Sequence, residues 1–229
     1  MKKYYINLDR SKERRKFMES LYKDIIRIEA YDGKKLNEYN DIILPEKYEE
    51  SINEIASSLS HIKAIITAYK NGDQEALILE DDISNKYKNK WEKSIQEIIN
   101  DAPNDTECIK FHCNNHINLR EMLKNKVLYK RWHVRDWGAQ CYYLNKKAIK
   151  KIYNMFYKNN KINLNIKLIN YLADYGTIFN NLITYSYCRP LFINEIFETT
   201  IHNINDRDVK REKKVRYTII KYFRNLKEK

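Results

Sequence analysis

The sequence has few of the residues that interrupt a fold, with only 4 glycines and 3 prolines in 229 residues. No glycine-, serine- or proline-rich segment divides the chain, so nothing in it resembles an interdomain linker. One α/β domain of about 200–250 residues is ordinary. These features predict a single globular domain over residues 1–206, followed by a basic helical tail over residues 207–229.

Paired cysteines and long apolar runs are also missing. No Cys-x-x-Cys pair occurs among the four cysteines, so free thiols are expected at Cys108, Cys113, Cys141 and Cys188. No stretch approaches the ~18 apolar residues of a membrane span. The opening residues are basic and then aromatic, unlike a signal peptide. We therefore expect a cytoplasmic protein, which would lie in the host cytoplasm if the source is viral.

Charge is plentiful and mostly positive, with a net charge of +12. Such a balance favours anionic partners, including nucleic acid, phospholipid headgroups or a phosphorylated substrate. The basic tail could lie peripherally on an anionic membrane, or it could be a solvated helix end. A nucleic-acid-binding protein is the main non-enzyme alternative, although the basic residues are spread along the whole chain.

Hydrophobic patterning predicts an α/β fold, because short apolar strands alternate with amphipathic segments. The clearest strand is the apolar run Ala76–Leu79, which is typical of a strand covered on both faces. Other strands are expected at residues 3–8, 25–28, 108–112, 138–144 and 189–193. Helices are expected after Ser11, from Ser58 to Tyr69, around Trp91 to Ile99, from Lys146 to Tyr157, from Tyr171 to Ile183 and in the tail.

An acidic triplet, Glu80-Asp81-Asp82, follows the apolar run directly. Three adjacent carboxylates at the end of a buried strand repel one another, and desolvation adds to the cost. Ligands of open α/β sheets bind at the carboxyl ends of the strands. Carboxylates at that edge suit Mg²⁺ or Mn²⁺, which would also neutralise a diphosphate. A solvated surface turn is the alternative.

Several motifs in order give the chain a resemblance to a known family. The segment Tyr5–Arg15 resembles the opening motif of glycosyltransferase family 25, which includes lipooligosaccharide and collagen hydroxylysine galactosyltransferases. Further similar segments follow in the family's order: Arg27 with Ala30–Gly33, Ser58–His61, Leu77–Asp82, and Gly138–Leu144 followed by Lys147 and Ala148. Asp174 stands where a late aspartate of the family is expected, although Leu172-Ala173 replaces the Pro-Val that commonly precedes it.

The resemblance implies a GT-A type nucleotide-sugar-binding fold, a single Rossmann-like domain with a mixed central sheet. It also implies an inverting, metal-dependent transfer of galactose or glucose from a UDP-hexose. The acceptor would be a hydroxyl of a glycan, as in lipopolysaccharide biosynthesis, or of a hydroxylysine-type residue, as in collagen glycosylation. A metal-dependent nuclease is the enzymatic alternative, because an acidic cluster with bound metal would tolerate phosphate.

We predict that Asp82 and Glu80 bind Mn²⁺ or Mg²⁺, with His202 as a third ligand. Glu80 and Asp81 would orient the ribose or share the metal through water. His202 follows the last predicted strand, and an exposed histidine in a polar segment is the alternative there.

Donor contacts are predicted for Asn7, Arg14 and Arg15, on the first strand-to-helix connection, where uridine or phosphate would lie. Ser60 and His61 are expected to open a helix aimed at the same crevice, since helix N-termini favour anions. For His61, a hydrogen-bonded structural imidazole is the alternative.

An inverting transfer needs a general base, for which Asp136, Asp174 and Glu195 are candidates. The resemblance favours Asp174. Trp137 could offer a flat face to a sugar ring. A zinc site built from Cys108, His112, Cys113 and His116 is a further alternative, but its spacing fits no standard zinc motif.

Overall fold

The computed structural model describes residues 1–197 and 206–226. Its centre is a seven-stranded mixed sheet in the order β2-β1-β4-β8-β6-β11-β7. β1 is parallel to β2 and β4, and β6 is parallel to β11, whereas β8 is antiparallel to both β4 and β6. These strands span Lys2–Asn7 (β1), Ile25–Glu29 (β2), Glu75–Glu80 (β4), Cys108–Lys110 (β6), Tyr129–Arg131 (β7), Cys141–Asn145 (β8) and Thr184–Tyr187 (β11). The predicted α/β class with a mixed central sheet is confirmed.

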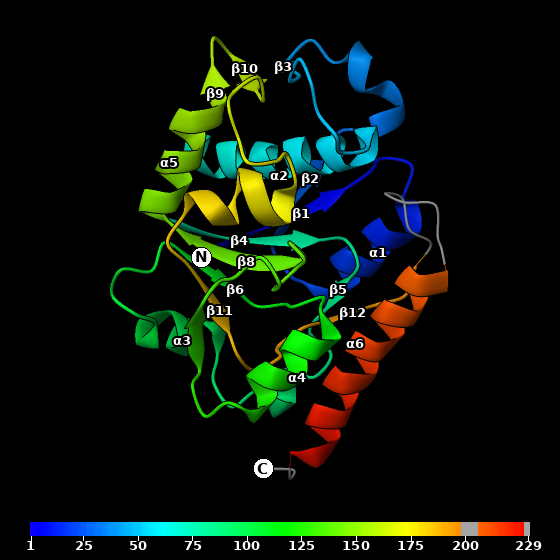
Figure 1. The fold of residues 1–229 in the computed structure, drawn as a ribbon, viewed down its shortest axis with the longest axis vertical. Coiled ribbons are helices and arrows are strands. Elements are labelled where there is room, and N and C mark those ends of the chain that lie inside the picture. Colours follow the sequence, from blue (N-terminus) through cyan, green and yellow to red (C-terminus); the bar gives the residue numbers. More distant parts are fainter. Residues whose placement is uncertain (198–205, 227–229) are drawn as a thin grey trace.

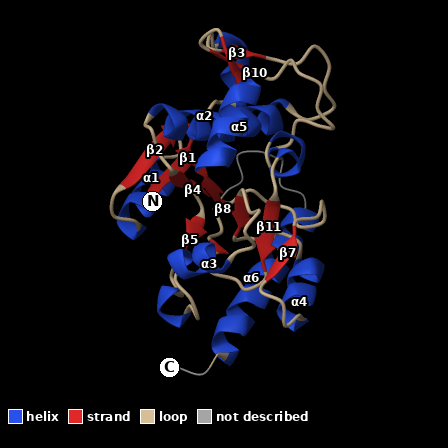
Figure 2. Ribbon diagram, turned by 90° about the vertical axis from the view of Figure 1, so that its left-hand side faces the viewer, coloured by secondary structure: helices blue, strands red, loops and turns tan. Residues whose placement is uncertain are grey.

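Helices cover both faces of this sheet (Figures 1 and 2). The α-helices are α1 (Lys12–Leu21), α2 (Ile52–Lys70), α3 (Ile95–Asp101), α4 (His116–Lys124), α5 (Lys146–Phe156) and α6 (Asp206–Asn225). Two small sheets lie beside the main one, formed by β3 (Ile42–Ile43), β9 (Tyr157–Lys158) and β10 (Lys161–Asn163), and by β5 (Ile83–Ser84) and β12 (Ile193–Asn194). Single helical turns occur at Gly33–Glu38, Lys88–Lys90, Ala173–Thr177 and Phe179–Asn181.

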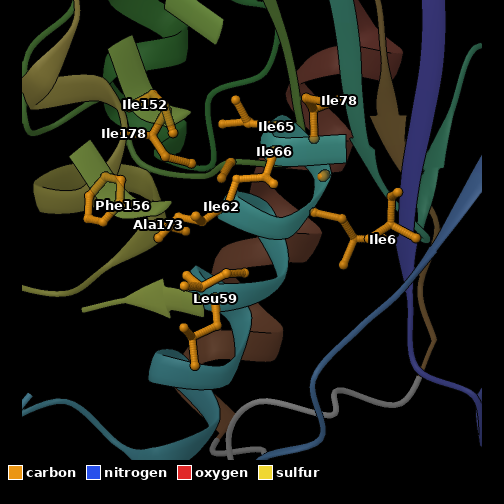
Figure 3. Packing of buried hydrophobic residues seen from close by; sticks show 14 of the residues in the cluster. Ile6, Leu59, Ile62, Ile65, Ile66, Ile78, Ile152, Phe156, Ala173 and Ile178 are labelled. Carbon is orange, nitrogen blue, oxygen red and sulfur yellow. The ribbon is translucent and has the colours of Figure 1, made fainter. Parts of the chain in front are cut away.

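Alternation along the central strands divides the core into two layers, as the period of a strand requires. Ile78 of β4 faces the α2 and α5 layer, whereas Leu77 and Leu79 face the layer that contains Met18 of α1 and Ile98 of α3. Figure 3 shows the first layer, in which α2 side chains such as Leu59 and Ile62 pack among residues from the sheet and α5. The prediction that the apolar run is covered on both faces is confirmed.

Helix ends follow local sequence signals. Ser51 caps α2 in a capping box with Glu54, and Ser94 caps α3 in the same way with Glu97. α2 therefore begins at Ile52, earlier than the predicted start at Ser58, and Gly72 follows its end with φ 72°.

Four other boundaries differ from the predictions. The helix expected around Trp91 begins only at Ile95, after its cap at Ser94. Residues 171–183 form two short turns instead of one helix. The strand expected at 189–193 is reduced to β12, and α4 and β7 lie between residues 112 and 138, where the patterning predicts neither a helix nor a strand.

The tail helix α6 packs on the domain through its apolar points. Val215, Ile219 and Phe223 are buried against Leu119 of α4 and Ile193 of β12. Among the described residues, no helix is both long and apolar enough to cross a membrane. The apolar face of α6 is thus already covered, so the predicted membrane contact would have to rely on the charges of its outer face.

The α2 layer provides a stability test. Ile62 is 0% exposed in the core, whereas Ile117 on α4 is 57% exposed. We expect Ile62→Ala to lower the free energy of unfolding by about 2–5 kcal/mol, through lost burial and a residual cavity. The matched variant Ile117→Ala should stay within about 0.5 kcal/mol of the wild type. Urea unfolding measures both; equal losses would contradict this packing.

Candidate active site

The acidic triplet lies at the carboxyl edge of the sheet, beside the end of β1. β1 and β4 are parallel, and their register pairs Ile6 with Glu80. Asn7, the last residue of β1, therefore lies next to Asp81, and its Nδ2 donates a hydrogen bond to Asp81 Oδ2 at 2.7 Å. The pairing of these strands brings together two parts of the sequence 74 residues apart.

Asp81 is the anchored member of the triplet. Arg14 of α1 donates a hydrogen bond from Nη1 to Asp81 Oδ1 at 2.8 Å, and both side chains are largely buried. Burial raises the pKa of Asp81, while Arg14 and Asn7 act in the opposite direction. Arg14 also lies over the ring of Phe197, with 5.1 Å from Cζ to the centroid. Asp81 thus fixes Arg14 at the edge of the sheet.

Asp82 differs from its neighbour because its Oδ1 atom is buried without a hydrogen-bond partner. Burial, followed by the negative charge of Glu80, raises the pKa of Asp82 well above its ordinary value. Its backbone oxygen accepts a hydrogen bond from the N–H of Glu195 at 2.7 Å. The backbone of Asp82 is therefore held in place, while one carboxylate oxygen receives no hydrogen bond from the described part of the chain.

Glu80 is partly exposed and lies next to His61 of α2. The His61 Nε2 atom is 3.5 Å from Glu80 Oε1, and Nδ1 is 3.0 Å from the Tyr142 hydroxyl. Ser60 accepts a hydrogen bond from the Tyr31 N–H and donates one to the Ala56 carbonyl. Because α2 begins at Ile52, Ser60 and His61 lie inside the helix, so the prediction that they form its anion-binding N-terminus is wrong.

Two neighbouring cavities open at this edge. The larger has a volume of about 420 Å³ and the smaller about 80 Å³, and both are lined by Arg14, Ser57 and Glu80. Apolar and polar groups from the ends of β1 and β2 line the smaller one. The residues lining the larger include six carboxylates and two guanidinium groups: Glu54, Glu80, Asp82, Asp174, Glu195 and Glu212, with Arg14 and Arg211.

Asp174 lines the larger cavity, in the turn Ala173–Thr177. Its Oδ2 atom accepts a hydrogen bond from the N–H of Gly138 at 2.8 Å. Glu195 lines the same cavity, so two of the three predicted bases share it with Asp82.

Asp136 and Arg15 lie elsewhere. Asp136 is 0% exposed, accepts hydrogen bonds from four donors and does not line either cavity, so the structure argues against its predicted role as a base. Arg15 is exposed on α1 and pairs with Glu19 at 3.0 Å, which leaves it outside the site. His202 lies outside the described residues.

The tail supplies two cavity residues that the sequence analysis missed. Arg211 and Glu212 of α6 line the larger cavity, and the Arg211 guanidinium lies 5.7 Å from the centre of the Trp137 ring. Arg216 of α6 also pairs with Glu195 at 2.8 Å. In the sequence, Glu212 is one of three acidic residues in a predominantly basic helix, and no local pattern distinguishes it or Arg211 from the residues beside them.

A zinc site is not supported by the geometry. Among residues 1–197 and 206–226, no group of three or more histidines, cysteines, aspartates or glutamates is arranged to hold a metal ion. The four cysteines are buried and unpaired, as expected. The acidic edge therefore brings together two carboxylates, Glu80 and Asp82, without a complete ligand set in this part of the chain.

A mixed α/β sheet whose strand-end carboxylates line a cavity has a candidate ligand site at the edge where open α/β sheets bind their ligands. The family model of glycosyltransferase family 25 (LPS biosynthesis protein) matches residues 1–169. The chain belongs to this family and is a glycosyltransferase, which leaves the nucleic-acid-binding and nuclease alternatives without support. The family implies a nucleotide-sugar donor and a glycan acceptor in general terms.

Solved structures show a more distant likeness. A glycosyltransferase involved in glycosylation of the major capsid of PBCV-1 is 14% identical, with 93% of this chain and 98% of that chain covered and a TM-score of 0.41. HddC from Yersinia pseudotuberculosis, complexed with GMP-PN, is 13% identical over 93% and 99%, with a TM-score of 0.34.

A mutant Drosophila β-1,4-galactosyltransferase 7, in complex with manganese, UDP-Gal and xylobiose, is 8% identical over 92% of this chain and 79% of that chain, with a TM-score of 0.34. Among curated proteins, none matches the chain significantly.

The buried His112 provides a pH test. Burial, reinforced by the Lys110 ammonium, lowers the pKa of His112 from 6.5 to about 3. The unfolded chain takes up this proton below about pH 6.5 and the folded chain does not, so stability present above that pH is lost as the pH falls. Between pH 7 and 5 the loss should be about 2 kcal/mol.

We expect His112→Gln to show a correspondingly shallower fall in the free energy of unfolding over this range, measured by urea titration at each pH. The exposed His133, changed to Gln, is the control. Equal pH slopes for the His112 variant and the wild type would contradict the buried neutral imidazole.

Proposed function

We propose that the protein transfers a hexose, galactose or glucose, from a UDP-sugar to a hydroxyl group of a glycan or a hydroxylysine-type residue, with inversion and with a divalent cation. The observation that carries this proposal is the Asp82 carboxylate, whose buried Oδ1 atom lacks a partner at the wall of a cavity of about 420 Å³. Membership of the glycosyltransferase family supports the reaction class.

The acidic edge fits Mn²⁺ or Mg²⁺ chemically. Asp82 and Glu80 supply hard oxygen ligands, and their mutual repulsion would be relieved by a cation. Asp82 and Glu80 would hold the metal, with His202 completing the ligand set. When bound, the cation would neutralise charge on the diphosphate leaving group.

The smaller cavity offers contacts to one edge of the nucleoside. Ile6, Leu8 and Tyr31 give it apolar walls, and Ser60 and Asn53 give it polar groups. Arg14 lines both cavities, and its guanidinium is held by Asp81. The diphosphate of a UDP-hexose bound across the two cavities would therefore lie near a fixed cation of the protein, which binds phosphate oxygens well. The hexose would then extend into the larger cavity.

We propose Asp174 as the general base of the transfer reaction. Its carboxylate would accept the proton of the acceptor hydroxyl as that oxygen bonds to the anomeric carbon of the hexose, while the bond from this carbon to the phosphate oxygen breaks and UDP departs with the electron pair. The Gly138 N–H holds one carboxylate oxygen in place at 2.8 Å. A base fixed in this way is preorganised for proton transfer.

Changing Asp82 to Asn tests the metal proposal. The substitution keeps the side-chain size but removes the charge, so Mn²⁺-dependent release of UDP from UDP-galactose or UDP-glucose should fall at least about 100-fold. Asp105→Asn, at an exposed aspartate far from the cavities, is the matched control and should keep wild-type activity. Near-normal turnover of Asp82→Asn, with or without Mn²⁺, would refute the assignment.

Asp174→Asn separates the base from donor binding. The amide oxygen can still accept the Gly138 N–H, so the loop should stay in place, but the proton acceptor is lost. We expect kcat to fall about 100- to 10,000-fold, with the dissociation constant for UDP and Mn²⁺ little changed in calorimetry. Parallel losses of binding and turnover would show that Asp174 has a structural role instead.

A further inference from the structure

Trp137 and Gly138 line the larger cavity, whereas the residue before them, Asp136, is buried away from it. Asp136 is 0% exposed, whereas the next residue, Trp137, is a large aromatic side chain that is 42% exposed and lines the cavity. Gly138 then takes a φ of 99°, which favours glycine. An exposed indole is thus held between two tightly constrained neighbours.

Asp136 fixes the backbone before the tryptophan. Its carboxylate accepts hydrogen bonds from Asn118 Nδ2 at 3.0 Å, Lys130 Nζ at 2.8 Å and Ser186 Oγ at 3.0 Å. The N–H of His133 adds a fourth at 3.2 Å, which closes the loop on itself. Satisfying a buried carboxylate in this way requires side chains from three separate elements.

Lys110 fixes the tryptophan's own carbonyl group. This lysine is 1% exposed, and its Nζ donates hydrogen bonds to the carbonyl oxygens of Trp137, at 2.8 Å, and His112. The Asn114 N–H donates to the same Trp137 oxygen at 2.8 Å. Burial lowers the pKa of Lys110. Buried charges contribute little net stability, so the buried Asp136 in this loop and the buried Lys110 at the end of β6 are better explained by what they position.

Gly138 links this loop to the proposed base. Its N–H binds the Asp174 carboxylate, and a Cβ atom at this position would come within 2.1 Å of Gln140 Oε1 and 3.1 Å of Asn114 Cβ. The peptide that follows the indole is therefore the peptide that holds the base. One hydrogen bond therefore connects the peptide next to Trp137 with Asp174.

We propose that the indole of Trp137 is the acceptor subsite, and that it binds the apolar face of a neutral hexopyranoside with one hydroxyl directed at Asp174. This inference rests on the proposed function and names its acceptor class. An indole offers a flat apolar face with little conformational freedom. The carboxylates of Glu54, Glu195 and Glu212 on the same cavity disfavour an anionic sugar. Arg211 of α6, whose guanidinium lies over the ring at 5.7 Å from its centre, borders the subsite from the tail.

The test compares transfer with hydrolysis in the full-length chain. Mn²⁺ and UDP-galactose or UDP-glucose are supplied in both assays. Hydrolysis is measured as UDP release without an acceptor. Transfer is measured with p-nitrophenyl β-galactoside, β-glucoside or β-N-acetylglucosaminide as acceptor. Trp137→Ala should raise the acceptor KM and lower the ratio of transfer to hydrolysis at least about tenfold. Trp137→Phe keeps an aromatic face and should recover most of that ratio.

Tyr217→Ala is the matched control, because Tyr217 is an aromatic residue of α6 that is 59% exposed outside the cavity. It should leave the ratio unchanged. The subsite is refuted if Trp137→Ala leaves the ratio unchanged, or if an enzyme that hydrolyses a UDP-hexose glycosylates none of the three probes. If the wild type releases no UDP from either donor, the proposed function itself fails, and the acceptor subsite with it.

Discussion

The site depends on electrostatic repulsion among three carboxylates confined to the end of one buried strand. Each is managed differently. Asp81 is neutralised by Arg14 and hydrogen-bonded by Asn7, which ties α1 and β1 to β4. Glu80 lies beside His61 and is partly exposed to solvent. Asp82 alone keeps a buried oxygen without a partner, and its pKa is raised accordingly. The repulsion between Asp82 and Glu80 is not fully compensated by the protein, so its relief would favour the binding of a cation.

The sequence predicts those parts of the site that depend on the local pattern of apolar and polar residues. An apolar run that ends in acids places Glu80, Asp81 and Asp82 at a strand end, and a strand–turn–helix unit places Asn7 and Arg14 beside them. Arg15 shows the limit of this reasoning, because one step along a helix turns a side chain by about 100° and carries it to another surface. Pattern identifies an element, but contacts between elements decide which residues face the cavity.

Longer-range contacts explain the other differences. Asp136 and Asp174 look alike in sequence as candidate bases, yet one is enclosed by Asn118, Lys130 and Ser186 and the other faces the cavity. No local signal marks Lys110 as buried under the Trp137 carbonyl, since a lysine in a strand is ordinarily taken as exposed. The capping boxes at Ser51 and Ser94 are local sequence patterns, and they account for where α2 and α3 begin.

The net charge of the chain is positive, whereas the charged residues that line the larger cavity are mostly negative. The chain carries +12 overall, while six carboxylates and only two guanidinium groups are among the residues lining the larger of the two cavities. A long-range positive field would draw an anionic donor towards the surface, and the acidic cavity would accept it only with a cation to offset the repulsion. α6 contributes to both effects. Its outer face carries exposed lysines, whereas Glu212 lies at the cavity and Arg216 pairs with Glu195. The tail therefore belongs to the electrostatics of the site as much as the acidic triplet does.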